Sequence, residues 1–203
     1  MKISVIGTGN IGGTLGSKWA AAGHEVIFGT RNPQSEKVQG LLQKAGNGTT
    51  AVPVPQSIAN TEAVLFAIPG GTMAETAQQS GSQLNGKIVI DATNNVGKTP
   101  MNNLDLLRKT APNAYLFRAF STLGWENFAN PNINGTQADL FYCGDGGDAQ
   151  TAVHNLIADI GLNPVCLGGN ETAPILDSLT QLWFILALQQ KRGRHLAFKM
   201  LNA

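Results

Sequence analysis

The sequence predicts an α/β fold with a doubly wound, mostly parallel β-sheet and a small strand–helix addition at its C-terminal end. Short apolar runs alternate with segments of helical length along most of the chain, which is typical of βαβ units. The runs "AVLFAIP" (63–69) and "GKIVIDAT" (86–93) are apolar at nearly consecutive positions, as expected for strands buried on both faces. A glycine-rich loop joins the first apolar run to the first helical segment.

The individual elements follow from apolar periodicity and turn residues. Strands are expected at 2–7, 25–30, 50–53, 63–69, 86–93, 114–120, 138–144 and 163–168. Helices are expected at 10–23, 34–46, 55–60, 71–84, 103–111, 147–161 and 172–190, with a turn over "AGNGTT" at 45–50. The polar, Asn-rich segment at 126–137 is the best candidate boundary. Because the last third is too short to be independent, we expect a single domain over residues 1–203, with residues ~136–203 as an extension packed on it.

Composition and charge exclude several classes of function. Of the 203 residues, 42% are hydrophobic and 13% are charged, and the net charge is +1, so the basic surface of a nucleic-acid-binding protein is missing. The most apolar run, "LWFILAL" (182–188), is shorter than the ~20 residues that a membrane span needs, and we interpret it as a buried helix face or an interface. The chain begins directly with a strand-like run, so no signal peptide is expected. We therefore expect a cytoplasmic protein without nucleic-acid or membrane partners.

The cysteines and histidines do not suggest a metal centre. Cys143 and Cys166 lie far apart and lack ligand or redox spacing, so two reduced thiols are expected. His24, His154 and His195 share no ligand spacing, so no metal site is expected.

The first loop matches G-x-G-x-x-G, with the residues Gly7, Thr8, Gly9, Asn10, Ile11 and Gly12. Its position between an apolar strand and a helix favours a dinucleotide-binding loop. Gly7 permits the tight turn, Gly9 lets the backbone approach a pyrophosphate, and Gly12 allows the helix to pack closely on the strand. The free N–H groups and the positive end of the helix dipole would face the phosphates. The alternative is a glycine-rich turn without a ligand.

The second strand ends in "GTR", where dinucleotide-binding folds often carry an acidic residue for the ribose 2′-hydroxyl of NAD. Gly29 leaves space, Thr30 brings a hydroxyl, and Arg31 brings a fork of donors suited to a phosphate. Lys37 adds a second positive charge if its helix folds back over the site. The alternatives are a solvated arginine at a strand end and a lysine on a helix surface. The pattern predicts NADP(H) rather than NAD(H).

Ligands of such folds bind outside the carboxyl ends of the strands. Those ends are the segments "AIPGG" (67–71), "DATNN" (91–95) and "AFSTLGW" (119–125). We expect Asp91 to cap a helix or fix a loop rather than act as a catalytic acid, and we expect Asn94 to neighbour the nicotinamide half. Ser121 and Thr122 would either donate hydrogen bonds to a substrate or satisfy backbone groups of their own loop.

A longer pattern covers nearly the whole chain. It consists of "ISVIGTGNIGGTLGSKWAAAGHEVIFGTRNP", "VLFAIP", "KIVIDATNN", "FRAFSTLGWENFANP", "DLFYCGDGGDAQTAVHNLIADIGLNPVCLGG" and "ILDSLTQLWFILALQQKRGRHLAFKML". In this order the segments resemble the coenzyme F420-dependent NADP oxidoreductase family, which is also similar to the N-terminal reductase domain of the STEAP metalloreductases. The "AFSTLGWENFANP" segment and the C-terminal part are the more specific features, since the loop and "GTR" occur in many NADPH proteins.

The resemblance implies a Rossmann-type domain with a small C-terminal addition, a homodimer, and hydride transfer between NADP(H) and a deazaflavin (F420) or flavin-like acceptor. It places the pyrophosphate at Thr8, Gly9, Asn10 and Ile11, the 2′-phosphate at Thr30 and Arg31, the length of the cofactor along Ala67, Ile68 and Pro69, and the nicotinamide near Asn94 and Ala119. The acceptor side would be formed by Ser121, Thr122 and Leu123.

No segment suggests a dedicated catalytic side chain. No Ser/His/Asp arrangement is evident, and neither Tyr115 nor Tyr142 is followed by Lys four residues later, as a short-chain dehydrogenase would require. A hydride that moves between two stacked rings needs positioning and exclusion of water more than an acid or a base. We therefore expect none of the side chains to be catalytic.

Two departures from the family fall on the acceptor side. Gly70 and Gly71 stand where the F420 enzymes tend to carry bulkier residues, and Ser121 stands where they can carry histidine. The acceptor therefore stays open among F420, a flavin, and a quinone- or metal-chelate-type compound. Two other functions compete with this one: a pyrroline-5-carboxylate or other imine reductase, and a non-catalytic NADP(H)-sensing protein that acts through a protein contact.

Overall fold

The computed structural model describes residues 1–46 and 48–202. The strands are β1 (Lys2–Ile6), β2 (Glu25–Gly29), β3 (Thr50–Val52), β4 (Ala63–Phe66), β5 (Ile88–Asp91), β6 (Tyr115–Arg118), β7 (Asn132–Ile133), β8 (Thr136–Gln137), β9 (Asp139–Gly144) and β10 (Asn163–Cys166). The α-helices are α1 (Asn10–Ala21), α2 (Glu36–Ala45), α3 (Val54–Ile58), α4 (Met73–Ser80), α5 (Leu104–Thr110), α6 (Trp125–Ala129), α7 (Asp148–Asp159) and α8 (Ala173–Phe184). Shorter helical turns are η1 (Gly70–Thr72), η2 (Gly81–Leu84), η3 (Asn170–Thr172) and the π-helical η4 (Ile185–Gln189).

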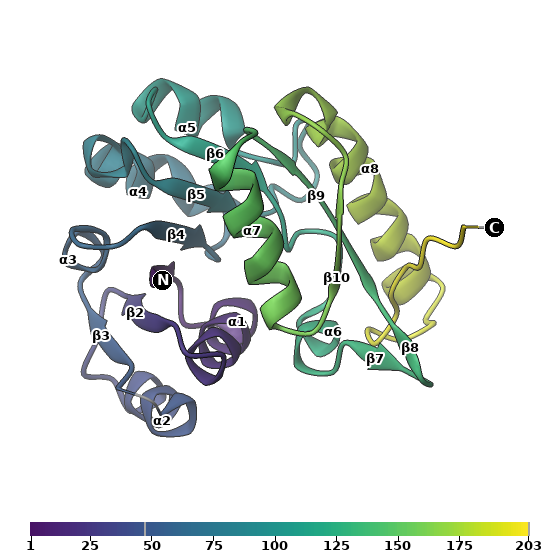
Figure 1. The fold of residues 1–203 in the computed structure, drawn as a ribbon, viewed down its shortest axis with the longest axis horizontal. Helices are drawn as coiled ribbons and strands as arrows, with labels where there is room; N and C mark the ends of the chain where they lie inside the picture. The colour runs from purple at the N-terminus through teal and green to yellow at the C-terminus, as the bar shows by residue number, and fades with distance from the viewer. Residues whose placement is uncertain (47, 203) are drawn as a thin grey trace.

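Eight strands form one sheet in the order β10-β9-β6-β5-β4-β1-β2-β3. All neighbours from β3 to β6 pair in parallel, so the carboxyl ends of these strands meet at one edge of the sheet. The sheet grows outward from β1 in both directions, which places a crevice where the strand order reverses. β9 pairs antiparallel with β6, and β10 pairs parallel with β9. The predicted α/β fold with a mostly parallel sheet and a small C-terminal addition is confirmed (Figure 1).

The core consists of two apolar clusters on the two faces of the sheet. One cluster contains buried residues of α1, α6 and α7, and the other contains buried residues of α3, α4, α5 and the start of α8. Successive residues of β1 alternate between them, with Val5 in the first cluster and Ile6 in the second, as the pleat of a strand requires. Every residue of β4 and of β5 is buried, as their continuous apolar runs predicted.

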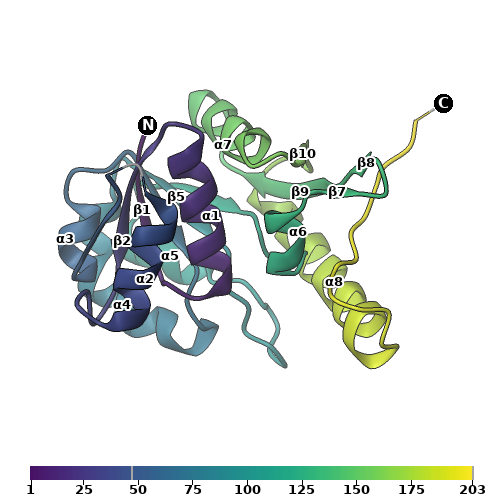
Figure 2. The ribbon, with the colours of Figure 1, turned by 90° about the horizontal axis from the view of Figure 1, so that it is seen from below.

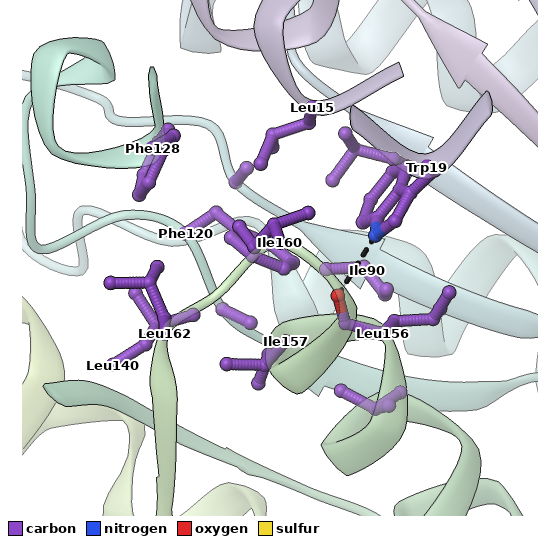
Figure 3. Close-up of a cluster of buried hydrophobic side chains, with 14 of the residues drawn as sticks. Leu15, Trp19, Ile90, Phe120, Phe128, Leu140, Leu156, Ile157, Ile160 and Leu162 are labelled. Atoms are coloured by element: carbon purple, nitrogen blue, oxygen red, sulfur yellow. Dashed lines mark hydrogen bonds between the residues drawn. The ribbon is translucent and has the colours of Figure 1, made fainter. Parts of the chain in front are cut away.

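The C-terminal addition packs directly on the first helix (Figure 3). Trp19 of α1 is fully buried, and its indole Nε1 donates a hydrogen bond of 2.8 Å to the carbonyl oxygen of Leu156 in α7. The Trp19 ring also meets Phe120 edge to face, and Phe120 meets Phe128 in the same way, each pair with 5.7 Å between ring centroids. The proposed boundary near residue 136 falls in the β7–β8 hairpin, and the division of the chain there stays a prediction.

The end of the described chain forms an extended strap, residues 191–202, which lies beside β9 and ends away from the body of the molecule (Figures 1 and 2). Asp139 N donates to Phe198 O at 3.0 Å. The buried carboxylate of Asp139 accepts hydrogen bonds from Lys199 Nζ and Met200 N, both at 2.6 Å. These contacts fix the strap to the second strand from the edge of the sheet.

Two segments differ in detail from the sequence-based prediction. The Asn-rich boundary segment contains the helix α6 and the β7–β8 hairpin, whose turn is formed by Asn134 and Gly135, both with positive φ. The helix predicted over 172–190 is present, but its last turn, η4, is π-helical. The turn predicted over 45–50 includes Asn47, which lies outside the described residues.

Candidate cofactor-binding site

The glycine loop connects β1 to α1 at the carboxyl edge of the sheet. Gly7 has a φ of +110°, and a Cβ atom on it would overlap the carbonyl oxygen of Ala67. A Cβ on Gly12 would overlap the carbonyl oxygen of Gly7. Gly9, in contrast, faces open space. The backbone at Gly9 can therefore be approached closely by a ligand, while Gly7 and Gly12 are required by the packing of the loop.

The first turn of α1 has the properties of an anion site. The helix begins at Asn10, its first turn contains no acidic residue, and Gly13 N donates to Gly9 O at 2.8 Å. The backbone N–H groups of the first residues of a helix have no intrahelical partner, and the helix dipole adds partial positive charge there. Within the described residues, the N–H groups of Asn10, Ile11 and Gly12 therefore lack an intrahelical acceptor just behind the loop.

A cleft of about 440 Å³ opens beside this loop. Its lining includes nine of the residues predicted to hold the cofactor: Gly7, Thr8, Gly9, Thr30, Arg31, Lys37, Ala67, Ile68 and Pro69. They come from the ends of β1, β2 and β4 and from the first turn of α2. The topology therefore gathers residues that are up to 62 positions apart in the sequence into one cleft at the switch point of the sheet.

Two cations stand on the wall of this cleft. Arg31 follows β2, Lys37 lies in the first turn of α2, and both side chains are exposed. In the described part of the chain neither of them makes a salt bridge with a carboxylate. Both side chains are therefore available to bind an anionic ligand. Lys37 was expected at the site only if α2 folded back over it, and its place in the lining shows that α2 does so.

Gly29 has a role that differs from the predicted one. It lines the cleft, but a Cβ on it would lie 2.5 Å from Ser57 Oγ. Ser57 is buried beneath β2, where its hydroxyl donates to Val54 O and accepts from Ser4 Oγ, both at 2.8 Å. The missing side chain of Gly29 makes room for α3 rather than for a phosphate, so the predicted reason for this glycine was wrong.

The opposite wall of the cleft is polar and was not predicted. It is formed by α4 and the turn before it, through Thr72, Glu75, Thr76 and Gln79. These positions follow the i, i+3, i+4, i+7 spacing of one helix face. The polar stripe that directly follows "AIPGG" could therefore have predicted this wall from the sequence. The hydroxyls of Thr72 and Thr76 are bonded to the backbone of their own turn, which leaves Glu75 and Gln79 as the adaptable groups.

The residues predicted near the nicotinamide lie beyond this cleft, after β5 and β6. Asn94 is half-buried, and its Nδ2 donates to Ser121 O at 3.2 Å. Ala119 is fully buried, and Ser121, Thr122 and Leu123 are no more than 5% exposed. The Ser121 and Thr122 hydroxyls are buried without a hydrogen-bond partner among the described residues. None of these five residues lines the cleft, and their roles stay predictions.

The backbone is strained in the middle of this segment. Phe120 has a φ of +59°, a left-handed conformation that a bulky side chain rarely adopts. Its ring is fully buried between Trp19 and Phe128, which holds it in place. Strain of this kind costs on the order of 1–3 kcal/mol and concentrates at functional sites. It turns the chain so that Ser121 O faces Asn94 and Thr180.

Gly70 and Gly71, which depart from the family pattern, have different surroundings. A Cβ on Gly70 would lie 2.8 Å from Asn94 O, whereas Gly71 faces open space. Gly70 therefore allows the segment after β4 to pack against the segment after β5. Of the two, only Gly71 leaves room for a larger side chain.

Arg118 is a fully buried residue that was not predicted as part of the site. It lies at the end of β6 and makes salt bridges with Asp91 (3.6 Å) and Asp177 (3.1 Å). Asp91 also accepts from Thr93 N at 2.9 Å and from Asn103 N at 2.7 Å, which is the loop-fixing role expected of it. The sequence signal was a charged residue inside the apolar strand "YLFRAF", because buried charges are rare unless they are paired.

No three His, Cys, Asp or Glu side chains in the described ranges are grouped as a metal ion requires. Within the same residues, the helices are too short or too polar to cross a membrane.

Comparison with known sequences shows which proteins the chain is similar to. Residues 2–95 match the family described as NADP oxidoreductase coenzyme F420-dependent. The whole chain is 28% identical to the F420-dependent NADP reductase of Methanothermobacter thermautotrophicus, over 95% of that protein. It is also 22% identical to the metalloreductase STEAP3 of Rattus norvegicus, over 88% of this chain and 36% of that protein.

Solved structures show the same fold. A protein of Arthrobacter sp. FB24, described as a candidate F420-dependent NADP-reductase, matches with a TM-score of 0.87 over 100% of both chains at 24% identity. The reductive aminase of Aspergillus terreus in complex with NADPH and ethyl-5-oxohexanoate matches with a TM-score of 0.70 at 18% identity, over 94% of this chain and 63% of that one. At these identities the likeness shows the fold alone.

Proposed function

We propose that the chain is a member of the F420-dependent NADP oxidoreductase family, which residues 2–95 match. In this proposal it transfers a hydride between NADP(H) and a planar redox acceptor. The acceptor is F420, a flavin or a ring compound of similar shape. The M. thermautotrophicus relative, which is named for F420 and NADP, supports F420 as the first acceptor to test.

One observation carries the choice of cofactor: beside the glycine loop, the cleft has two cations without a carboxylate partner among the described residues, where NAD-binding folds often place a carboxylate. Arg31 and Lys37 line it together with the hydroxyl-bearing Thr30. A guanidinium fork suits the oxygens of a 2′-phosphate. The open space at Gly9 and the free N–H groups at the start of α1 suit a pyrophosphate. These residues fit NADP(H) as a ligand.

When bound, the reduced nicotinamide supplies the hydride that the reaction transfers. The protein's residues contribute binding and alignment. Arg31, Thr30 and Lys37 hold the 2′-phosphate end, the loop from Thr8 to Ile11 holds the pyrophosphate, and Ile68 with Pro69 forms an apolar surface along the cleft. Hydride transfer between stacked rings depends on such alignment and on exclusion of water. In this proposal no side chain moves a proton.

The acceptor would bind next to the segment after β6. The buried hydroxyls of Ser121 and Thr122 have no protein partner within the described residues, and unsatisfied buried groups are costly. Donation to a carbonyl oxygen of the acceptor ring would satisfy them. Leu123 would add apolar contact.

We further propose a cytoplasmic homodimer. Ile175, Leu182, Ile185 and Leu188 of α8 and η4 are each between 40% and 60% exposed, and their spacing of seven, three and three residues places them on one side of the helix. A second copy of the chain is the partner that would cover them. Light scattering after gel filtration tests the dimer, and Leu182→Glu should shift it towards the monomer.

The cofactor is tested by titrating the protein with NADPH and with NADH and following the fluorescence of the bound nicotinamide. We expect a preference for NADPH, and we expect Arg31→Glu to weaken NADPH binding by roughly 10- to 100-fold, since it removes charge-assisted hydrogen bonds and adds a repulsive charge. Equal affinity for NADPH and NADH, or an unchanged affinity in Arg31→Glu, contradicts the proposal.

The reaction is tested by following NADPH absorbance with F420, free flavins and quinones, and with cyclic imines as the competing substrate class. Oxidation by F420 or a flavin supports the proposal. Oxidation only by an imine favours the imine reductase. Tight NADPH binding without turnover of any acceptor favours the sensing protein.

A further inference from the structure

Arg118 is held rigidly by acceptors from two separate segments, residues 91–94 and α8. Its Nη atoms donate to Asp91 O (3.3 Å), Thr93 O, Asn94 Oδ1 (2.6 Å) and Asp177 Oδ1 (3.1 Å). The two carboxylates are fixed in turn, because each also accepts backbone N–H groups from residues 101–103. The guanidinium therefore has a single orientation.

The fixed guanidinium determines the orientation of the Asn94 side-chain amide, that is, where its oxygen and its nitrogen lie. A guanidinium donates hydrogen bonds and cannot accept them, so the amide atom that faces Arg118 is the oxygen. The amide nitrogen then faces Ser121 O at 3.2 Å. An amide nitrogen carries two N–H groups, and Ser121 takes one of them. Asn94 therefore offers one further donor.

Asn94 adjoins the end of the cofactor cleft. Pro69 lines the cleft, and the following residue, Gly70, packs on the backbone of Asn94 so closely that a Cβ would lie 2.8 Å from Asn94 O. Arg31 and Lys37 mark the adenosine end on the other side of the glycine loop. A dinucleotide laid along the cleft extends past Pro69 with its nicotinamide half.

We propose that Arg118 is a positioning residue that orients Asn94 as a hydrogen-bond donor to the carboxamide oxygen of the nicotinamide. Arg118 itself does not touch the ligand: it acts through Asn94 Oδ1. The inference rests on the proposed function, since it needs NADP(H) in the cleft. It adds to that function a specific contact for the reactive end of the cofactor.

The first test replaces the donor and keeps the acceptor. Asn94→Asp retains an oxygen for Arg118 but loses the N–H groups, and Asn94→Leu loses both without adding charge. Binding is measured with NADPH and with adenosine 2′,5′-bisphosphate, which has the adenosine end of NADPH but no nicotinamide. We expect both variants to lower the ratio of the two affinities roughly tenfold while the affinity for the bisphosphate stays within about twofold.

The matched control is Asn85→Asp, the same change at the opposite edge of the sheet. Asn85 Oδ1 accepts from Asn113 N at 2.9 Å, and its Nδ2 makes only a long bond of 3.4 Å to Ser82 O. We expect this variant to bind both ligands as the unmodified protein does. An unchanged affinity ratio in the two Asn94 variants overturns the inference and leaves the proposed function intact. Failure of the unmodified protein to bind either ligand overturns both.

The second test asks whether Arg118 acts through Asn94. Arg118→Lys keeps the charge but not the fork, so we expect the affinity ratio to fall in the same direction as in Asn94→Asp. If the two residues act as a unit, the double variant Asn94→Asp, Arg118→Lys shows no further fall. Equal weakening of both ligands by Arg118→Lys, or additive effects in the double variant, would show a merely structural role and overturn the inference.

Discussion

The cleft beside the glycine loop and the protein interior behind it differ in how their positive charges are surrounded. Arg31 and Lys37 are exposed and lack a carboxylate partner in the described chain, whereas Arg118 is completely buried between Asp91 and Asp177. The two regions lie at the same edge of the sheet, one after β2 and the other after β6.

This difference in burial suggests different roles: the exposed cations bind a ligand, whereas the buried cation positions other residues. An exposed cation keeps its hydration until a ligand replaces it, so its removal should alter affinity and leave the fold unchanged. A buried cation has lost its hydration during folding, and its partners compensate for that loss only while all of them are present. Removal of the buried cation should therefore alter the fold first.

The largest expected effect tests this contrast directly. Arg118→Met leaves two buried carboxylates without their cation, and we expect the free energy of unfolding to fall by about 3–5 kcal/mol. Urea denaturation followed by tryptophan fluorescence measures it. Arg31→Met is the matched control, and its free energy of unfolding should stay within about 0.5 kcal/mol of the unmodified protein. Similar losses in the two variants would remove the contrast.

A smaller effect is expected within the glycine loop, where Gly12 is required for packing and Gly9 faces the open cleft. Gly12→Ala places a methyl group against Gly7 O, and we expect the free energy of unfolding to fall by about 1–3 kcal/mol. Gly9→Ala meets no protein atom, so its stability should be unchanged while its affinity for NADPH falls.

Thermal unfolding together with NADPH titration separates the two variants. If Gly9→Ala lowered the unfolding temperature as much as Gly12→Ala, Gly9 would be required for the packing of the loop and not for the approach of a ligand. Normal NADPH binding by Gly9→Ala would mean that the pyrophosphate does not approach the backbone there.

The smallest expected effect concerns the strap, where a buried carboxylate meets a lysine that is about one-third exposed. Burial alone would raise the pKa of Asp139, but hydrogen bonds from Lys199, Met200 and Asn163 lower it below its ordinary value of 3.8. A lowered pKa in the folded state stabilises the protein above the ordinary pKa, and this stabilisation is lost as the pH falls below it.

Asp139→Asn should therefore be less stable than the unmodified protein at pH 7, by about 1–2 kcal/mol, and the difference should shrink at pH 3. Urea denaturation at the two pH values measures it, with Asp148→Asn on the exposed first turn of α7 as the control. A difference that does not depend on pH would show that the charge of Asp139 does not hold the strap.

The features that could be predicted are those that local sequence encodes. The continuous apolar runs of β4 and β5 indicated a parallel sheet covered on both faces. The glycine loop and "GTR" line one cleft, and their role in binding a cofactor stays a prediction. The β7–β8 hairpin was missed although Asn134-Gly135 is a strong turn signal. The polar stripe of α4 was equally visible from its spacing.

The remaining features depend on contacts between distant residues. Arg118 and Asp177 are 59 positions apart, and nothing near either residue indicates that they meet. The antiparallel direction of β9 and the return of the strap to Asp139 are set by tertiary packing in the same way. The role of Gly29 was misread because Ser57, which fills the space beside it, comes from a different helix.

The hydrogen bond between Trp19 and Leu156 limits how early α1 can complete its packing while the chain is being synthesised. During synthesis, α1 is complete long before α7 exists, so the indole of Trp19 has neither its acceptor nor its apolar neighbours from α7. A nascent chain that ends before residue 156 lacks the acceptor of the indole N–H and the apolar side chains of α7 that pack in the same cluster. The N-terminal part of the sheet therefore cannot reach its final packing on the ribosome until most of the polypeptide has been translated.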